Sequence, residues 1–179
     1  MEVRLSSFDE NWKTMYETEC EEISSILSDL IIKFEHFGST SIEGMKAKPV
    51  IDMIVIVKSI KAVDQFNPEF LTRGYDVAGE WGIKGRRLMR KGGQNRTHHI
   101  HIYEQGNPEI DRHIIFRDYL KEHKEIAKEY SKFKEKLASQ FNDTSQYSKA
   151  KKSYVKRLEN RAITWYQQNN GVMEWKYES

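Results

Sequence analysis

The chain has 179 residues, which is enough for one domain, and its 29 Lys and Arg nearly balance its 27 Asp and Glu, leaving a net charge of +2. A net charge this small gives no support for nucleic-acid binding by the protein as a whole. It excludes neither a local basic patch nor a nucleic-acid substrate. The single Cys20 excludes an intramolecular disulfide, and the longest apolar run, VIDMIVIV, is too short for a membrane span. Without an apolar signal region at the N-terminus, we expect a soluble cytoplasmic protein with no membrane partner.

The first third of the chain predicts a helix and then a strand. Between residues 9 and 32, apolar residues recur at helical spacing, which predicts an amphipathic helix. Residues 50–57 are rich in β-branched side chains and follow Pro49, which is typical of a strand. Alternation places Asp52 and Ile54 on one face, and because both faces are otherwise apolar we expect this strand to be central.

The rest of the chain mixes strands and helices. Residues 59–106 predict a short helix and then strands over 86–91 and 97–103, with glycines between them. Asn107 and Pro108 are typical of a helix start, and they open a helix through residue 123, a second helix to about residue 141 and a last, longer one.

This order of elements predicts an α+β fold, a mixed β-sheet packed with helices. We expect an α/β core over residues 1–106 and a helical segment over residues 107–179 that packs on it in one compact domain. The basic stretch KAKKSYVKR in that segment is typical of a solvated helix face, and we favour this interpretation over a nucleic-acid patch. Nothing in the sequence defines an oligomeric state.

A small turn rich in hydroxyl groups precedes the predicted central strand. It consists of Gly38, Ser39, Thr40 and Ser41, whose amides and hydroxyls could donate to an anion, although Gly and Ser are also ordinary turn residues. Asp52 is the only charge in the strand that follows. An ionised carboxylate that is removed from water is costly unless it is paired or bound to a cation, so we expect a partner for Asp52.

Histidines gather in the segment RTHHIHIY, residues 96–103. Alternation sets His99 and His101 on one face of the predicted strand and His98 on the other. Two histidines at this spacing can supply two ligands to one metal ion or bind a phosphate. The alternative, in which they are partly exposed and hydrogen-bond to neighbours, stays open at this point.

Basic side chains surround these two segments. Because alternation sends the charges of the strand over 86–91 to both of its faces, at least one face should border a cleft. A lysine beside Pro49, at the entrance of the Asp52 strand, is also placed to reach a pocket. These basic residues are Lys48, Arg86, Arg87, Arg90, Lys91 and Arg96.

The chain resembles the GrpB family in five motifs, which occur in order over nearly its whole length: HFGSTSIEGMKAKPVID, GIKGRRLMRKG, RTHHIHIY, HIIFRDYL and YSKAKKSYV. That family is similar to the nucleotidyltransferase fold of the DNA polymerase β superfamily. In that superfamily a Gly-Ser turn binds a triphosphate, and acids on the next strand, in the pattern Asp-x-Asp or Asp-x-Glu, hold metal ions with another acid from a later strand. The resemblance implies that Gly38 and Ser39 bind phosphate and that Asp52 is the first metal-binding carboxylate.

The chain departs from the superfamily pattern at two points. Ile54 occupies the position of the second carboxylate, and His99 and His101 stand where a later acid is expected. Because Mg²⁺ prefers oxygen ligands and imidazole suits Zn²⁺ or Mn²⁺, the site is either adapted to another metal or no longer catalytic for nucleotidyl transfer.

Three functional hypotheses follow. The first is nucleotidyl transfer from a nucleoside triphosphate to an unknown acceptor, with Asp52, His99 and His101 as catalytic residues and ligands of a divalent metal, Mg²⁺ or Mn²⁺ with Zn²⁺ as an alternative. The second is a non-catalytic module that binds a nucleotide or phosphorylated metabolite on the same fold, and the third is a metal-dependent hydrolase built on the histidines and Asp52. The predicted substrate-binding residues are Gly38, Ser39, Thr40, Ser41, Lys48, Arg86, Arg87, Lys91, Arg96 and His98.

Overall fold

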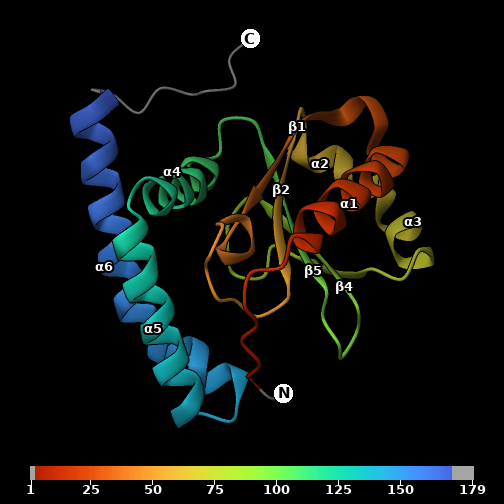
Figure 1. Ribbon diagram of the computed structural model, residues 1–179. Helices are drawn as coiled ribbons and strands as arrows, with labels where there is room; N and C mark the ends of the chain where they lie inside the picture. The colour runs from red at the N-terminus through yellow and green to blue at the C-terminus, as the bar shows by residue number, and fades with distance from the viewer. Residues whose placement is uncertain (1–2, 171–179) are drawn as a thin grey trace.

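A computed structural model describes residues 3–170, and a five-stranded sheet forms the centre of the molecule (Figure 1). The strands run in the spatial order β1-β2-β5-β4-β3, with β2 and β5 parallel and the other neighbours antiparallel. The central position predicted for residues 50–57 is confirmed, because β2 lies between β1 and β5. The strands are β1 (Ile31–Phe37), β2 (Ile51–Val57), β3 (Asp76–Gly79), β4 (Arg86–Lys91) and β5 (His98–Glu104).

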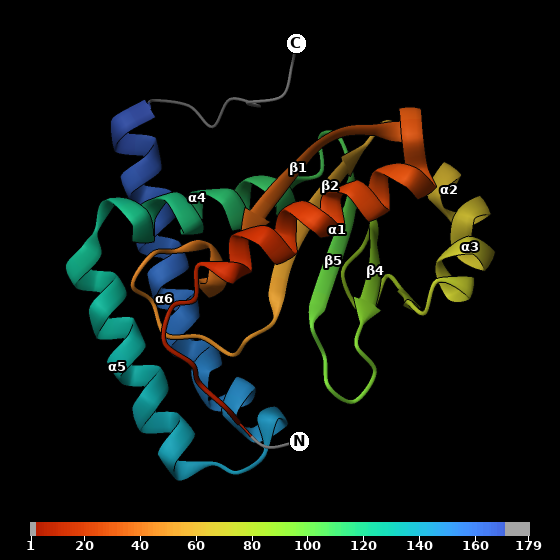
Figure 2. The ribbon, with the colours of Figure 1, turned by 45° about the vertical axis from the view of Figure 1, so that its right-hand side comes forward.

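Helices cover both faces of this sheet (Figure 2). One face packs against α1 (Asn11–Leu27), α2 (Ile60–Val63) and α3 (Asn67–Thr72), and the other packs against α4 (Pro108–Glu122). The helices α5 (Lys124–Gln140) and α6 (Thr144–Asn170) lie side by side beyond α4 (Figures 1 and 2). Three short 3₁₀ helices complete the described chain: η1 (Ser28–Leu30), η2 (Ser39–Ser41) and η3 (Asp64–Phe66).

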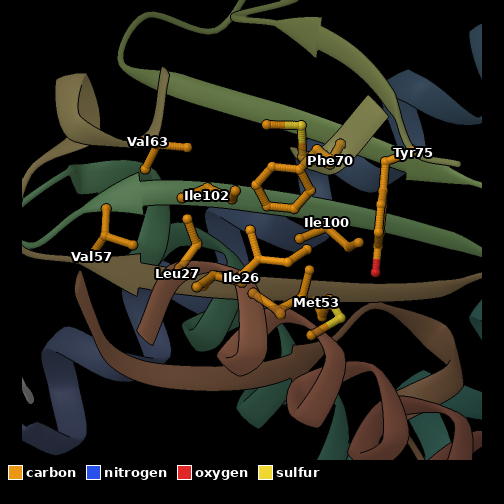
Figure 3. Packing of buried hydrophobic residues seen from close by; sticks show 12 residues of the cluster. Ile26, Leu27, Met53, Val57, Val63, Phe70, Tyr75, Ile100 and Ile102 are labelled. Carbon is orange, nitrogen blue, oxygen red and sulfur yellow. The ribbon is translucent and has the colours of Figure 1, made fainter. Parts of the chain in front are cut away.

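The largest apolar cluster lies between the sheet and helices α1 to α3. Figure 3 shows Met53 of β2 and Ile100 of β5 close to Ile26 of α1 and Phe70 of α3. On the opposite face, Ile54 belongs to a second cluster that includes side chains of α4. The strand β2 is therefore buried on both sides, as its continuous apolar sequence indicates.

A third cluster joins the C-terminal helices to the loop between β1 and β2. Ile42 and Met45 from this loop pack with Tyr119 of α4, Tyr130 of α5 and Leu158 of α6. The packing brings α5 and α6 to the end of the sheet at which β2 begins, close to Asp52.

The predicted α+β fold, a mixed sheet packed with helices and followed by a C-terminal helical segment, is confirmed. The strands predicted over 50–57, 86–91 and 97–103 agree with β2, β4 and β5 to within one residue at each end. The predicted division of the chain at residue 106 falls in the turn between β5 and α4, and the division itself stays a prediction. The cytoplasmic location also stays a prediction. Within residues 3–170, no helix is long and apolar enough to cross a bilayer.

The prediction of one helix over residues 9–32 is wrong at its end, and β3 was not predicted. Helix α1 stops at Leu27 because Ser28 adopts a left-handed backbone conformation with φ 46°, and β1 then pairs antiparallel with β2. The pairing partner of β1 is about twenty positions away along the chain, so local periodicity does not reveal it.

Candidate functional site

Asp52 lies at the start of β2 and interacts with two histidines of β5. Its Oδ1 atom is 3.6 Å from Nδ1 of His99 and 3.8 Å from Nε2 of His101, because the parallel pairing of the strands puts Asp52 directly beside His99. Burial by itself raises the pKa of Asp52, but the interactions with His101 and His99 outweigh it and hold this pKa below its usual range. Asp52 is therefore a carboxylate at neutral pH, with the histidines as its partners.

Arg86 fixes the orientation of His101. Its Nη1 atom lies 3.2 Å from Nδ1 of His101, and because a guanidinium can only donate, Nδ1 must accept this hydrogen bond. Burial lowers the pKa of His101 against the opposing effect of Asp52, so the ring is neutral at pH 7. We therefore assign its single proton to Nε2, the atom that faces Asp52.

The Gly-Ser turn packs directly against Asp52. Gly38 has φ +72°, and a Cβ atom at this position would stand 2.7 Å from Oδ2 of Asp52. In η2, which follows, the Thr40 hydroxyl is 2.9 Å from Nε2 of His36, and the Ser41 hydroxyl donates to the carbonyl of Gly38. The hydroxyl of Ser39 accepts a hydrogen bond of 2.9 Å from Nζ of Lys134.

Three lysines converge on a cavity of about 220 Å³ beside this turn. Lys48 comes from the loop before β2, Lys134 from α5 and Lys151 from α6. Burial and the neighbouring lysines lower the pKa of Lys134 to about 7, and burial and Lys48 lower that of Lys151 to about 8. The other lining residues are Ser39, Thr40, Ala47, Val50, Asp52, His99 and Tyr147.

Tyr147 lies in the wall of the same cavity. The Nζ atoms of Lys48 and Lys151 stand 5.6 and 5.4 Å from the centre of its ring, within the range of cation–π interactions. Its hydroxyl is buried and has no hydrogen-bond partner among the described atoms. A buried donor without a partner and three crowded ammonium groups are both features that an anion in the cavity would satisfy.

The structure corrects three predicted substrate-binding residues, because the alternation of β4 and β5 sends them to the opposite face of the sheet. Arg87 pairs with Asp64 at 2.7 Å. Lys91 pairs with Glu19 of α1 at 2.9 Å, and His98 also faces α1.

Four further predicted substrate-binding residues lie outside the cavity wall: Gly38, Ser41, Arg86 and Arg96. Arg96 belongs to the turn between β4 and β5, and Arg86 acts on His101.

The prediction from sequence missed the contribution of the C-terminal helices to this cavity. Lys134 occupies a buried position in the helical stripe Ala127, Tyr130, Lys134 and Leu137. Lys151 follows Tyr147 by four residues and therefore shares its face of α6. Lys134 stands among the apolar residues of its helix, and this position in the sequence could have indicated that the lysine is buried and not on the solvent-exposed face.

The side chains around Asp52 do not fit the predicted metal site. Across residues 3–170, no group of three or more His, Cys, Asp or Glu side chains is arranged to hold a metal ion. Ile54 replaces the second carboxylate, and Nδ1 of His101 is occupied by Arg86 while its Nε2 carries the proton. Only Asp52 and His99 of the predicted set keep ligand atoms, which is too few for a two-metal centre.

The fold and the site together define an α+β domain with a half-buried, lysine-rich cavity next to a Gly-Ser turn. The family described as GrpB protein matches residues 2–161, and the chain belongs to this family.

Individual relatives agree with this assignment. The chain is 45% identical over 171 residues to UPF0157 protein YqkA of Bacillus subtilis, covering 95% of this chain but only about half the length of that relative. It is similar to the crystal structure of conserved protein GrpB from Enterococcus faecalis, with a TM-score of 0.87 and 40% identity over 91% of this chain and 99% of that one. A weaker similarity, with a TM-score of 0.46 and 13% identity, is to Cid1 in complex with its short product ApU, over 66% of this chain and 37% of that one.

Proposed function

We propose that this chain binds the phosphates of a nucleotide, or of another phosphorylated small molecule, in the cavity lined by Lys48, Lys134 and Lys151, which we call the lysine cavity. The observation that carries this proposal is the convergence of Lys48, Lys134 and Lys151 on one cavity in which Asp52 is the single acidic lining residue. Three ammonium groups in one cavity lose part of their hydration and repel one another, and both effects disfavour their charged form. A bound polyanion offsets both effects.

The chemistry of the cavity suits phosphate better than a single carboxylate. Phosphate groups present several oxygens, and the cavity offers three ammonium groups together with the hydroxyls of Ser39 and Tyr147 as donors. Asp52 supplies one negative charge in the cavity, so a singly charged ligand would still leave one of the three lysines without a counter-ion when all three are protonated.

The proposal is tested by titrating the protein with inorganic tripolyphosphate and with each nucleoside triphosphate in a calorimeter. We expect Lys134→Met and Lys151→Met each to weaken the binding by about tenfold or more, because each removes a buried charged contact. The matched controls are Lys132→Met and Lys152→Met, which change exposed lysines on the same two helices and should bind as the wild type does. If the wild type binds none of these ligands, or if the controls lose as much affinity as the cavity variants, the proposal fails.

One observation favours a second candidate function, nucleotidyl transfer. The contact between Gly38 and Asp52 brings a phosphate-binding turn beside an ionised carboxylate, as the superfamily resemblance implies. In this reaction an acceptor hydroxyl would attack the α-phosphorus of the triphosphate, and pyrophosphate would leave. The hydrolase alternative has less support, because His101 presents an N–H group and not a lone pair to the site.

This second candidate is tested by measuring pyrophosphate release from each triphosphate with Mg²⁺ or Mn²⁺ present. We expect release from the wild type and none from Asp52→Asn, while both proteins still bind tripolyphosphate. Tight binding of triphosphates with no product from the wild type would instead support the non-catalytic module.

A further inference from the structure

We infer that Trp81 is the stacking platform for the heterocyclic base of the nucleotide whose phosphates occupy the lysine cavity. This inference rests on the proposed function and extends it, because it makes the ligand a nucleotide and not a smaller phosphorylated compound. It follows from the exposure of Trp81, the residues that hold it in place and its position on the sheet.

Trp81 is unusually exposed for its residue type. The residue is 62% exposed, whereas large aromatic residues are usually mostly buried. Its backbone has φ 46°, in the left-handed region that is strained for a residue with a bulky side chain. A strained conformation that presents an indole ring to solvent contributes nothing evident to the apolar core, and such strain is typical of binding sites.

One face of the indole ring is already covered. The guanidinium carbon of Arg90 stands 4.7 Å from the ring centre, and Arg90 also pairs with Asp76 on the neighbouring strand. The cation therefore supports the ring from one side, and the exposure of Trp81 shows that much of the ring remains accessible. A base could stack there without displacing any protein contact.

Trp81 lies beside a row of side chains that leads to the cavity. In the sheet, Asp52 of β2 stands beside His99 of β5, and His99 stands beside Arg90 of β4. Arg90 is on the same face as Asp52, because it alternates with Arg86, which contacts His101. Two strand spacings, roughly 10 Å, separate Asp52 from Arg90, which is the scale of a nucleotide.

Arg86 also connects the loop that carries Trp81 to the Asp52 site. Its Nη2 atom donates to the carbonyl of Trp81 at 2.9 Å, and its Nε atom donates to the carbonyl of Glu80 at 3.2 Å. The same guanidinium donates to His101, which faces Asp52. One side chain therefore holds both the backbone of the loop at Trp81 and the His101 ring that faces Asp52.

The test compares ligands with and without a base. We expect Trp81→Ala to weaken the binding of ATP, GTP, CTP and UTP by about tenfold each, because stacking accepts any base, and to leave the binding of tripolyphosphate unchanged. Trp81→Phe should restore most of the lost affinity. The matched control is Leu71→Ala, which removes another exposed large apolar side chain on α3 and should change neither affinity.

The outcomes separate this inference from the proposed function. If the wild type binds tripolyphosphate and Trp81→Ala binds the triphosphates as tightly as the wild type, the inference is wrong and the phosphate site stands. An equal loss of tripolyphosphate and triphosphate binding in Trp81→Ala would also contradict it. Failure of the wild type to bind tripolyphosphate or any triphosphate would overturn both.

Discussion

Arg86 and His101 lie on neighbouring strands, and the 3.2 Å contact between Nη1 and Nδ1 decides which ring nitrogen of His101 faces Asp52 with a proton. This relationship turns a predicted metal ligand into a hydrogen-bond donor. The protonation of the ring nitrogen that faces Asp52 therefore depends on Arg86, a residue that does not line the cavity.

We therefore predict that Arg86→Met changes the protonation of the His101 ring. Without the donor, Nδ1 no longer has to accept, and the ring should become a mixture of both tautomers, visible in the ¹⁵N chemical shifts of its two nitrogens. The variant should also lose about 1–3 kcal/mol of unfolding free energy, because the carbonyls of Glu80 and Trp81 lose their donor. Arg87→Met is the control on the opposite face of the sheet, and an unchanged His101 spectrum in Arg86→Met would contradict the assignment.

The lowered pKa values of the cavity lysines predict how stability varies with pH. In the unfolded chain lysine has a pKa near 10.4, whereas in the folded protein those of Lys134 and Lys151 are about 7 and 8. Between these values the unfolded state binds more protons, so the unfolding free energy should rise as the pH increases from 7 to about 9.5, by at most about 1.4 kcal/mol per pH unit for each proton. Denaturant titrations across this range should show a smaller rise for Lys134→Met than for the wild type, and identical slopes would contradict the prediction.

The same two lysines predict proton uptake when a polyanion binds. At pH 8 Lys134 is mostly neutral in the free protein, and nearby phosphates raise its pKa so that it takes up a proton. Calorimetric titrations of tripolyphosphate in buffers of different ionisation enthalpy should report net uptake at pH 8 and weaker binding at pH 9. Lys134→Met should take up fewer protons, whereas Lys132→Met should match the wild type.

Gly38 and Gly44 form a matched pair for testing the turn. Both have positive φ, +72° and +79°, so alanine at either position incurs backbone strain of roughly 1–3 kcal/mol, and the ψ of −176° places Gly38 in a region that is nearly restricted to glycine. A Cβ atom at Gly38 would also clash with the Asp52 side chain, whereas at Gly44 it would meet nothing within 4 Å. We expect Gly38→Ala to lower the unfolding free energy by clearly more than Gly44→Ala and to weaken tripolyphosphate binding, and equal effects in denaturant titrations would contradict this.

Two buried tyrosines allow the role of a hydroxyl in binding to be distinguished from its role in stability. Tyr147 lines the lysine cavity and Tyr103 does not. Removing an unsatisfied buried hydroxyl should not destabilise the free protein, so we expect Tyr147→Phe to unfold at or above the wild-type temperature, whereas Tyr103→Phe also loses an interaction with Arg86 and should unfold at or slightly below it. Only Tyr147→Phe should bind tripolyphosphate more weakly, by several-fold, and a similar loss in Tyr103→Phe would show that the effect does not arise in the cavity.

The sequence by itself determined the features that depend on local pattern. Alternation along the later strand placed His99 and His101 on one face of β5, whereas the parallel pairing that brings Asp52 of β2 onto that same face came from the structure. The helix-start residues Asn107 and Pro108 marked the beginning of α4. The family also followed from the sequence, because five ordered motifs span nearly the whole chain.

Only the tertiary structure decided which charges reach Asp52. Alternation indicated that β4 has charges on both faces, but the packing of α1 showed that Lys91 points away from the site. Lys134 and Lys151 join Asp52 from about 80 and 100 positions further along the chain, through helices whose direction is set by contacts with the loop before β2. Local periodicity carries no information about such distant contacts, because it reports which face of a helix is buried and not what that face is buried against.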